Sequence, residues 1–249
     1  MTHGAPSSRR PAWLFPVIVL VVAGLLTVIS LAVRDSSPDE QKAAENPASS
    51  DAGGPAADVV EPTQEPLPDM ARRDADDPLA AGPTDAPVSL VVYSDYQCPY
   101  CASWAAQTQP AMLEYAEAGD LRVEWRDLNV FGTASLTAAR AAYAAGLQGH
   151  YPEYHDALFA DGEHRPAHQL SKKALIDLAA QLGLDADQFA SDLDSAEVAA
   201  GVEKNVQESM ELGIYSTPAF VLGGTPIVGA QPTDVFVGAF EDALARAQG

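Results

Sequence analysis

The chain has 249 residues, of which 47% are hydrophobic, and its formal net charge is −21. This composition excludes a wholly disordered chain and a collagen-like chain. An acidic surface repels phosphate groups, so we expect no binding to nucleic acid. The chain contains 2 cysteines, too few for a small fold that several disulfides hold together.

The N-terminal region predicts a membrane anchor. Residues 12–33 carry no charge and are mostly Val, Leu, Ile and Ala. A helix of this length spans about 33 Å, enough for a hydrocarbon core of about 30 Å. The alternatives are a cleaved signal peptide, whose apolar region is usually shorter, and a buried core helix. Because Arg9 and Arg10 precede the span and acids follow it, residues 1–11 are expected in the cytoplasm and the rest outside.

Residues 34–77 are predicted to form a disordered linker. The segment is rich in Pro, Ala, Asp and Glu, and no Phe, Trp or Tyr occurs between Phe15 and Tyr93. Such a segment cannot bury enough apolar surface to offset its chain entropy. It would tether a folded domain, residues 78–249, to the membrane without fixing the orientation of that domain.

The first half of the folded part alternates strands and helices. Residues 88–93 form a β-branched apolar run, which is typical of a buried strand. Residues 98–118 have the pattern of a helix, in which Pro110 should produce a kink. Residues 121–128 alternate apolar and charged side chains and therefore predict a half-buried strand. An Ala-rich helical insertion follows over about residues 135–212.

The C-terminal part completes an α/β fold. Residues 219–222 and 226–228 predict a short hairpin around Gly223 and Gly224, and residues 233–247 predict a final helix. The helices expected within the insertion cover residues 136–147, 151–159, 171–182, 186–193 and 196–212.

Both cysteines lie at the predicted junction of the first strand and the first helix, in Cys98-Pro99-Tyr100-Cys101. Unpaired N–H groups and the positive end of the helix dipole stabilise a thiolate at this position. The thiolate is the species that attacks disulfides, and Pro99 suits the first helical turn. Residues three apart on a helix share one face, so the two sulfurs can meet. We therefore predict a redox-active Cys98–Cys101 pair, with Cys98 the open nucleophile and Cys101 the more buried resolving thiol.

A zinc half-site and a static structural disulfide are the alternatives for this motif. Zinc needs two further Cys or His ligands, but no other cysteine exists and the nearest following histidine is His150. A disulfide that closes so short a loop removes little chain entropy. We therefore expect neither a metal ion nor a cofactor.

A second motif, Thr217-Pro218, precedes the predicted hairpin. A proline that enters a strand marks a special backbone position, often a cis bond, although an ordinary trans proline is the alternative. We predict a cis bond beside Cys98. The Thr217 backbone would then be open to strand-like hydrogen bonds with a substrate peptide.

The two motifs together resemble those of a known family. Residues 93–101, Tyr-Ser-Asp-Tyr-Gln-Cys-Pro-Tyr-Cys, are similar to the active-site segment of DsbA-like thioredoxin-fold proteins, and residues 213–220 are similar to their cis-proline segment. Residues 154–159 resemble a helix of the family's inserted helical domain. The resemblance covers about residues 77–247 and implies a thioredoxin-like fold. It implies these site residues: Cys98, Cys101, Thr217 and Pro218 as catalytic, and Pro99, Tyr100 and Asp95 as supporting.

Three positions depart from the family pattern. Val92 stands where many members carry a buried glutamate that helps proton movement at the buried thiol, and Asp95 is too close to the strand end to replace it. Ser216 stands in place of the usual glycine. Tyr100 replaces the histidine of the strongest oxidants, so no ionisable group with a pKa near neutrality lies between the sulfurs.

The resemblance implies a membrane-tethered, extracytoplasmic thiol–disulfide oxidoreductase. It would exchange disulfides with exported proteins through a mixed disulfide at Cys98, most often as an oxidase. A quinone-linked membrane partner of the DsbB or vitamin K epoxide reductase type would reoxidise it. A disulfide reductase and a non-catalytic thioredoxin-fold binding module are the alternatives. Isomerases usually carry an N-terminal dimerisation domain, and here the linker occupies that position.

Overall fold

The computed structural model describes residues 66–249. The predicted cytoplasmic segment 1–11, the membrane span 12–33 and linker residues 34–65 lie outside these residues. Within residues 66–249, no helix combines the length and the apolar character needed to cross a bilayer.

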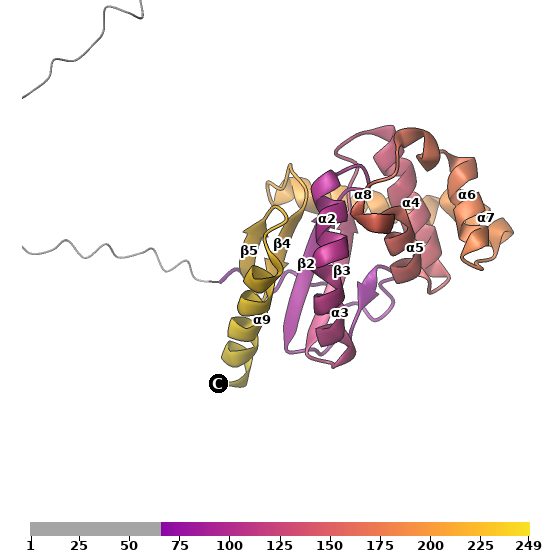
Figure 1. Ribbon diagram of the computed structural model, residues 1–249. Helices are drawn as coiled ribbons and strands as arrows, with labels where there is room; N and C mark the ends of the chain where they lie inside the picture. Colours follow the sequence, from indigo (N-terminus) through magenta and orange to yellow (C-terminus); the bar gives the residue numbers. More distant parts are fainter. Residues whose placement is uncertain (1–65) are drawn as a thin grey trace, which may run out of the picture. The chain divides into compact units, whose positions relative to one another are not determined.

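A five-stranded mixed sheet organises the domain, in the order β1-β3-β2-β4-β5 (Figure 1). The central strand β2 (Val88–Ser94) pairs in parallel with β3 (Leu121–Asp127) and antiparallel with β4 (Ala219–Leu222). The short strands β1 (Ala80–Ala81) and β5 (Thr225–Val228) form antiparallel edges. The α/β class predicted from the sequence is therefore confirmed.

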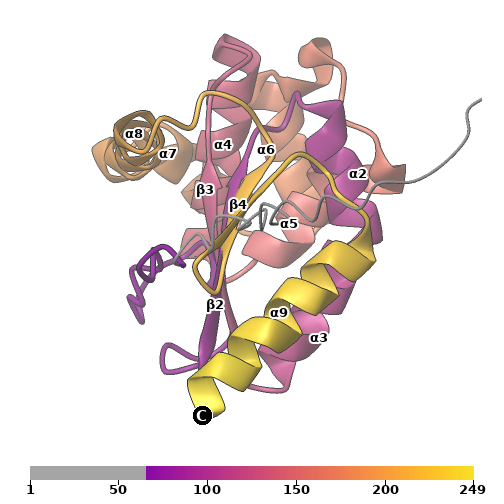
Figure 2. The ribbon, with the colours of Figure 1, turned by 90° about the vertical axis from the view of Figure 1, so that its left-hand side faces the viewer.

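Three helices pack near one face of the sheet: α2 (Pro99–Gln107), α3 (Gln109–Glu117) and α9 (Thr233–Gln248) (Figure 2). The single kinked helix expected over residues 98–118 is two helices that meet at Thr108. Pro110 explains the break, because it has no N–H and its ring clashes with the carbonyl four residues earlier.

The chain between β3 and β4 forms the expected helical insertion, which lies beside the sheet in Figure 1. At its centre is α4 (Thr133–Leu147), which contacts the other helices of the insertion. Most alanines of α4 are fully buried, and their small side chains let neighbouring helices approach closely. The remaining members are α5 (Tyr151–Leu158), α6 (Lys172–Gln181), α7 (Ala186–Leu193), α8 (Ala196–Glu211) and the 3-10 turns Ala160–Gly162 and Ala167–Leu170.

Strand β3 is buried on both faces, so the prediction of a half-buried strand is wrong. Its apolar residues face α3, while Glu124 and Arg126 form an ion cluster on the opposite face. The Arg126 guanidinium lies 2.6 Å from a Glu124 carboxylate oxygen and 3.1 Å from one of Glu208, which belongs to α8. The Tyr93 hydroxyl donates a second hydrogen bond to Glu208, at 2.8 Å. On this face of the sheet the paired charges adjoin a small apolar cluster that includes Val91 and Tyr93.

Residues 66–77, expected within the linker, are part of the folded domain. The backbone N–H groups of Arg72 and Arg73 each donate to a Glu124 carboxylate oxygen at 2.8 Å. The Leu67 N–H donates to the Gly224 carbonyl at 2.8 Å. The segment has no helix or strand up to Arg73; it adds hydrogen bonds to the buried, already ion-paired Glu124 carboxylate, and its Met70 and Ala71 pack against the apolar cluster that includes Val91 and Tyr93. The structure thus differs from the predicted domain boundary at residue 78.

Replacing Arg126 by Ala should remove the closest cation of the buried Glu124 carboxylate, leaving Arg122, at 3.2 Å, as its remaining ion-pair partner. Removing one partner of a buried ion pair costs about 3–5 kcal/mol, so the urea midpoint should fall sharply. Lys173→Ala is the control, since the Lys173–Asp177 pair is exposed and worth at most about 1 kcal/mol. Equal stability of the two variants in urea titrations would contradict this account of the cluster.

Candidate active site

The two cysteines lie where β2 leads into α2. Cys98 is the N-cap of α2, with φ −89° and ψ 117°, and Pro99 is the first helical residue. The Cys98 N–H donates to the Asp95 carbonyl at 3.0 Å, which tightens the loop before the helix. The Cys101 N–H donates to the Cys98 carbonyl at 3.1 Å, so Cys101 lies in the first helical turn. Both residues are free thiols in the structure.

The tertiary fold brings the second motif to the first. The Thr217–Pro218 peptide bond is cis. The Cys98 thiol donates to the Thr217 carbonyl, with 3.2 Å between sulfur and oxygen. The Thr217 hydroxyl is buried and has no hydrogen-bond partner within the described part of the chain. Residues 119 positions apart therefore meet at one site.

The two thiols differ in pKa although both residues are buried. Their exposed fractions are 2% for Cys98 and 1% for Cys101, so the expected openness of Cys98 is not seen. A hydrogen bond from the Cys101 thiol, helped by N–H groups of the first helical turn, lowers the pKa of Cys98 to about 6. Burial, followed by the adjacent Cys98, raises the pKa of Cys101 well above its usual value. Near neutral pH the geometry therefore favours a Cys98 thiolate beside a protonated Cys101.

Asp95 connects the active-site loop to the loop after β3. Its side chain is buried and accepts hydrogen bonds from the N–H groups of Gln97, at 2.8 Å, and Phe131, at 3.2 Å. Burial raises the pKa of this carboxyl. Asp95 makes no hydrogen bond to either sulfur through its side chain, so its contribution is to hold the loop that carries Cys98.

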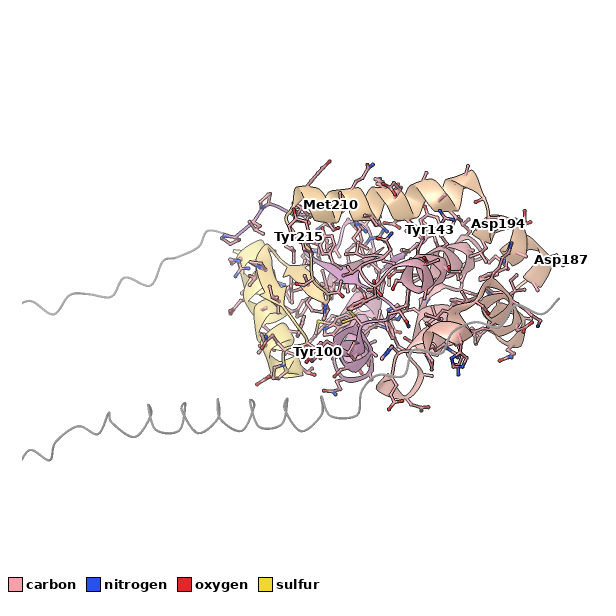
Figure 3. The ribbon with its side chains drawn as sticks, turned by 90° about the horizontal axis from the view of Figure 1, so that it is seen from above. Tyr100, Tyr143, Asp187, Asp194, Met210 and Tyr215 are labelled. Atoms are coloured by element: carbon pink, nitrogen blue, oxygen red, sulfur yellow. The ribbon has the colours of Figure 1, made fainter. Side chains whose placement is uncertain are left out.

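The rim of the site carries exposed aromatic side chains. Tyr100 of α2 is 66% exposed, and Tyr215, three residues before Pro218, is 73% exposed. Figure 3 labels both, with Tyr215 close to Met210 at the end of α8. Pro99 is also exposed.

A polar layer beneath the site escaped the sequence analysis. Asp127, the last residue of β3, is fully buried and accepts a hydrogen bond from the Tyr96 hydroxyl at 2.9 Å. Tyr151 donates to the same carboxylate at 3.2 Å, and buried His155 packs edge-on against Tyr96. One signal was present: Asp127 continues the period-two register of the buried apolar residues of β3, where a charge is unexpected.

Among residues 66–249, no three Cys, His, Asp or Glu side chains gather into a group that could hold a metal ion.

Comparison with known proteins places the domain among thioredoxin-fold chains. The family model described as Thioredoxin matches residues 74–242. A thioredoxin-like oxidoreductase from Silicibacter pomeroyi DSS-3 has a similar structure, with a TM-score of 0.58 and 28% sequence identity. The match covers 70% of this chain and 94% of that chain.

Two sequence relatives extend the comparison. The probable disulfide bond formation protein D of Bacillus anthracis is 24% identical over 148 residues, which are 57% of this chain and 68% of that protein. The Na(+)/H(+) antiporter NhaA of Herminiimonas arsenicoxydans is 33% identical over 172 residues, 69% of this chain. The match spans only 25% of the antiporter, so the similarity concerns a fraction of that protein.

Removing the Cys101 thiol should raise the pKa of Cys98 above about 6, because the largest cause of its lowering is the hydrogen bond from Cys101. Cys101→Ala removes the donor, whereas Cys101→Ser keeps a hydroxyl donor, so the alanine variant should show the larger rise. Thiolate absorbance near 240 nm, followed against pH, measures the pKa of Cys98 in both variants. A pKa of Cys98 that stays at about 6 in Cys101→Ala would assign the lowering to the helix terminus instead.

Proposed function

The chain belongs to the thioredoxin family, and from this we propose that it is a DsbA-like thiol–disulfide oxidoreductase that acts on exported proteins. One observation carries the proposal. A low-pKa cysteine and a high-pKa cysteine share one helical turn, and the first of them contacts the carbonyl before a cis proline. This is the arrangement that an attacking thiolate and a resolving thiol require.

In the oxidase direction, a substrate thiolate attacks the Cys98 sulfur of the Cys98–Cys101 disulfide, and Cys101 leaves as a thiolate. A second substrate thiolate then attacks the substrate sulfur of the mixed disulfide, and Cys98 leaves. Two electrons pass from the substrate to the cysteine pair. The low pKa of Cys98 makes it a good leaving group in the second step.

Oxidation is the direction that we propose. A thiolate stabilised in the reduced protein makes the disulfide a stronger oxidant, and the pKa of Cys98 is lowered to about 6. The Bacillus anthracis relative is a probable disulfide bond formation protein, which supports the same direction. The alternative is a reductase, and the reduction potential of the Cys98–Cys101 pair distinguishes the two directions.

We place the domain outside the cytoplasm, tethered by residues 12–33, with a quinone-linked membrane protein as its oxidant. The charge-free segment and its basic flank support this location. The Leu67 N–H donates to the Gly224 carbonyl, and the Gly223 N–H donates to the carbonyl of Ser89 at the start of β2, whereas Cys98 follows the end of β2. A tether that joins the domain at the end of the sheet away from Cys98 would leave the active site accessible to its partners.

Substituting Cys101 by Ser should trap substrates. Cys98 can still attack, but the resolving thiol is gone, so mixed disulfides with exported proteins should accumulate on non-reducing gels. Cys98→Ser is the matched control and should trap none. Trapping by the control, but not by Cys101→Ser, would reverse the two roles. Trapped partners that are all cytoplasmic would contradict the proposed location.

The reduction potential of the Cys98–Cys101 pair, equilibrated against glutathione, should lie closer to that of DsbA, about −120 mV, than to that of thioredoxin, about −270 mV. The reason is the stabilised Cys98 thiolate of the reduced form. A value near −270 mV would support the reductase alternative.

A further inference from the structure

The buried thiol of Cys101 needs a partner for its proton. Attack by Cys101 on a mixed disulfide requires its thiolate, yet burial and the neighbouring sulfur raise its pKa well above the usual value. Val92, two residues before Ser94 and on the same face of β2, has no polar atom in its side chain. The polar groups at the ends of the strands are therefore candidates for the proton acceptor.

Two such groups lie side by side. Hydrogen bonding by the Ser94 side chain partly offsets the raised pKa of the Cys101 thiol, and Ser94 is buried at the end of β2. Its register partner on β3 is Asp127. Register partners on neighbouring parallel strands lie about 4.8 Å apart and direct their side chains to the same face. Asp127 is thus the carboxylate that flanks Ser94 on the neighbouring strand and the same face of the sheet.

We propose that Ser94 and Asp127 form the route by which the proton of Cys101 leaves and returns. This inference rests on the proposed oxidoreductase function. In a mixed disulfide at Cys98, Ser94 accepts the Cys101 proton and passes its own to the Asp127 carboxylate, directly after a rotation of its hydroxyl or through one bridging water. The Cys101 thiolate attacks the Cys98 sulfur, the bond to the substrate sulfur breaks, and the substrate leaves as a thiolate. In the oxidase direction, Asp127 returns the proton to the departing Cys101.

The surroundings of Asp127 suit an exchangeable proton. Burial raises the pKa of its carboxyl to about 6, against the opposing effect of His155 and the tyrosine hydrogen bonds. A pKa close to the working pH lets a group both accept and donate a proton. The other titratable groups that face Asp127 are Tyr96 and Tyr151, which donate to it, His155, which packs on Tyr96, and Asp95, whose charge opposes its ionisation.

The test isolates the attack by Cys101. Reduced full-length protein treated with one equivalent of 5,5′-dithiobis(2-nitrobenzoate) forms a mixed disulfide at Cys98, and Cys101 then expels the coloured thiol. In the wild type, the rate of this release should rise as pH passes through about 6, because Asp127 must be ionised to accept the proton. Since Cys98 is blocked in this intermediate, its own titration does not contribute.

Asp127→Asn should slow the release at least about tenfold and remove the rise near pH 6, because an amide of the same shape accepts no proton. Ser94→Ala should slow it similarly with Asp127 intact, which keeps the proposal testable if the buried Asp127 variant folds poorly. Asp156→Asn is the control, because it removes an exposed carboxylate 3.5 Å from His155 and should leave the rate unchanged.

Wild-type release rates and pH profiles in both Asp127→Asn and Ser94→Ala would overturn the route. Equal slowing in the Asp156→Asn control would assign the effect to general electrostatics near His155 and would also overturn it. Failure of the wild type to form or resolve the mixed disulfide would instead refute the proposed function, so the two failures are distinguishable.

Discussion

The burial of β2 on both faces is the constraint on which the rest of the domain depends. All seven residues of β2 are buried, and its neighbours β3 and β4 pair along its two edges. Helices supply an apolar cover on one face. On the other face, a smaller apolar cluster that includes Val91 and Tyr93 accompanies the charged side chains of β3, and Glu124, Arg126 and Glu208 neutralise one another there. Residues 66–77 also pack on this face, so the segment that precedes β1 is part of the folded domain.

The pairing of strands in this sheet sets the position of the active site. The carboxyl end of β2 delivers Cys98 to the start of α2, and the antiparallel neighbour β4 begins directly after Pro218. Because Tyr93 and Ala219 are register partners, the two site segments must lie together. The contact between the Cys98 sulfur and the Thr217 carbonyl is a consequence of strand pairing rather than of local sequence.

The first turn of α2 then gives the two cysteine thiols different surroundings and different pKa values. Cys98 receives hydrogen bonds from its partner and from the helix terminus, whereas Cys101 lies deeper and is held by Ser94. The layer below, formed by Asp127 with Tyr96 and Tyr151, is polar in an otherwise apolar core. Buried polar groups are costly unless they are satisfied, and here their mutual hydrogen bonds satisfy them while leaving the carboxyl titratable.

The sequence by itself determined the α/β order, a distortion of the helical segment at Pro110, though not its division into two helices, and the placement of both cysteines at a strand-to-helix junction. These features follow from local rules: side-chain period, the geometry of proline and the polarity of a helix terminus. The charged alternation of β3 was misread as a solvent-facing side, because period alone does not say what covers a face. Only the tertiary structure decided that Glu124 binds the backbone of Arg72 and Arg73, and that Asp127 lies beside Ser94 on the neighbouring strand. Both depend on contacts between residues that are distant in the chain, and such contacts exist only once the sheet has assembled.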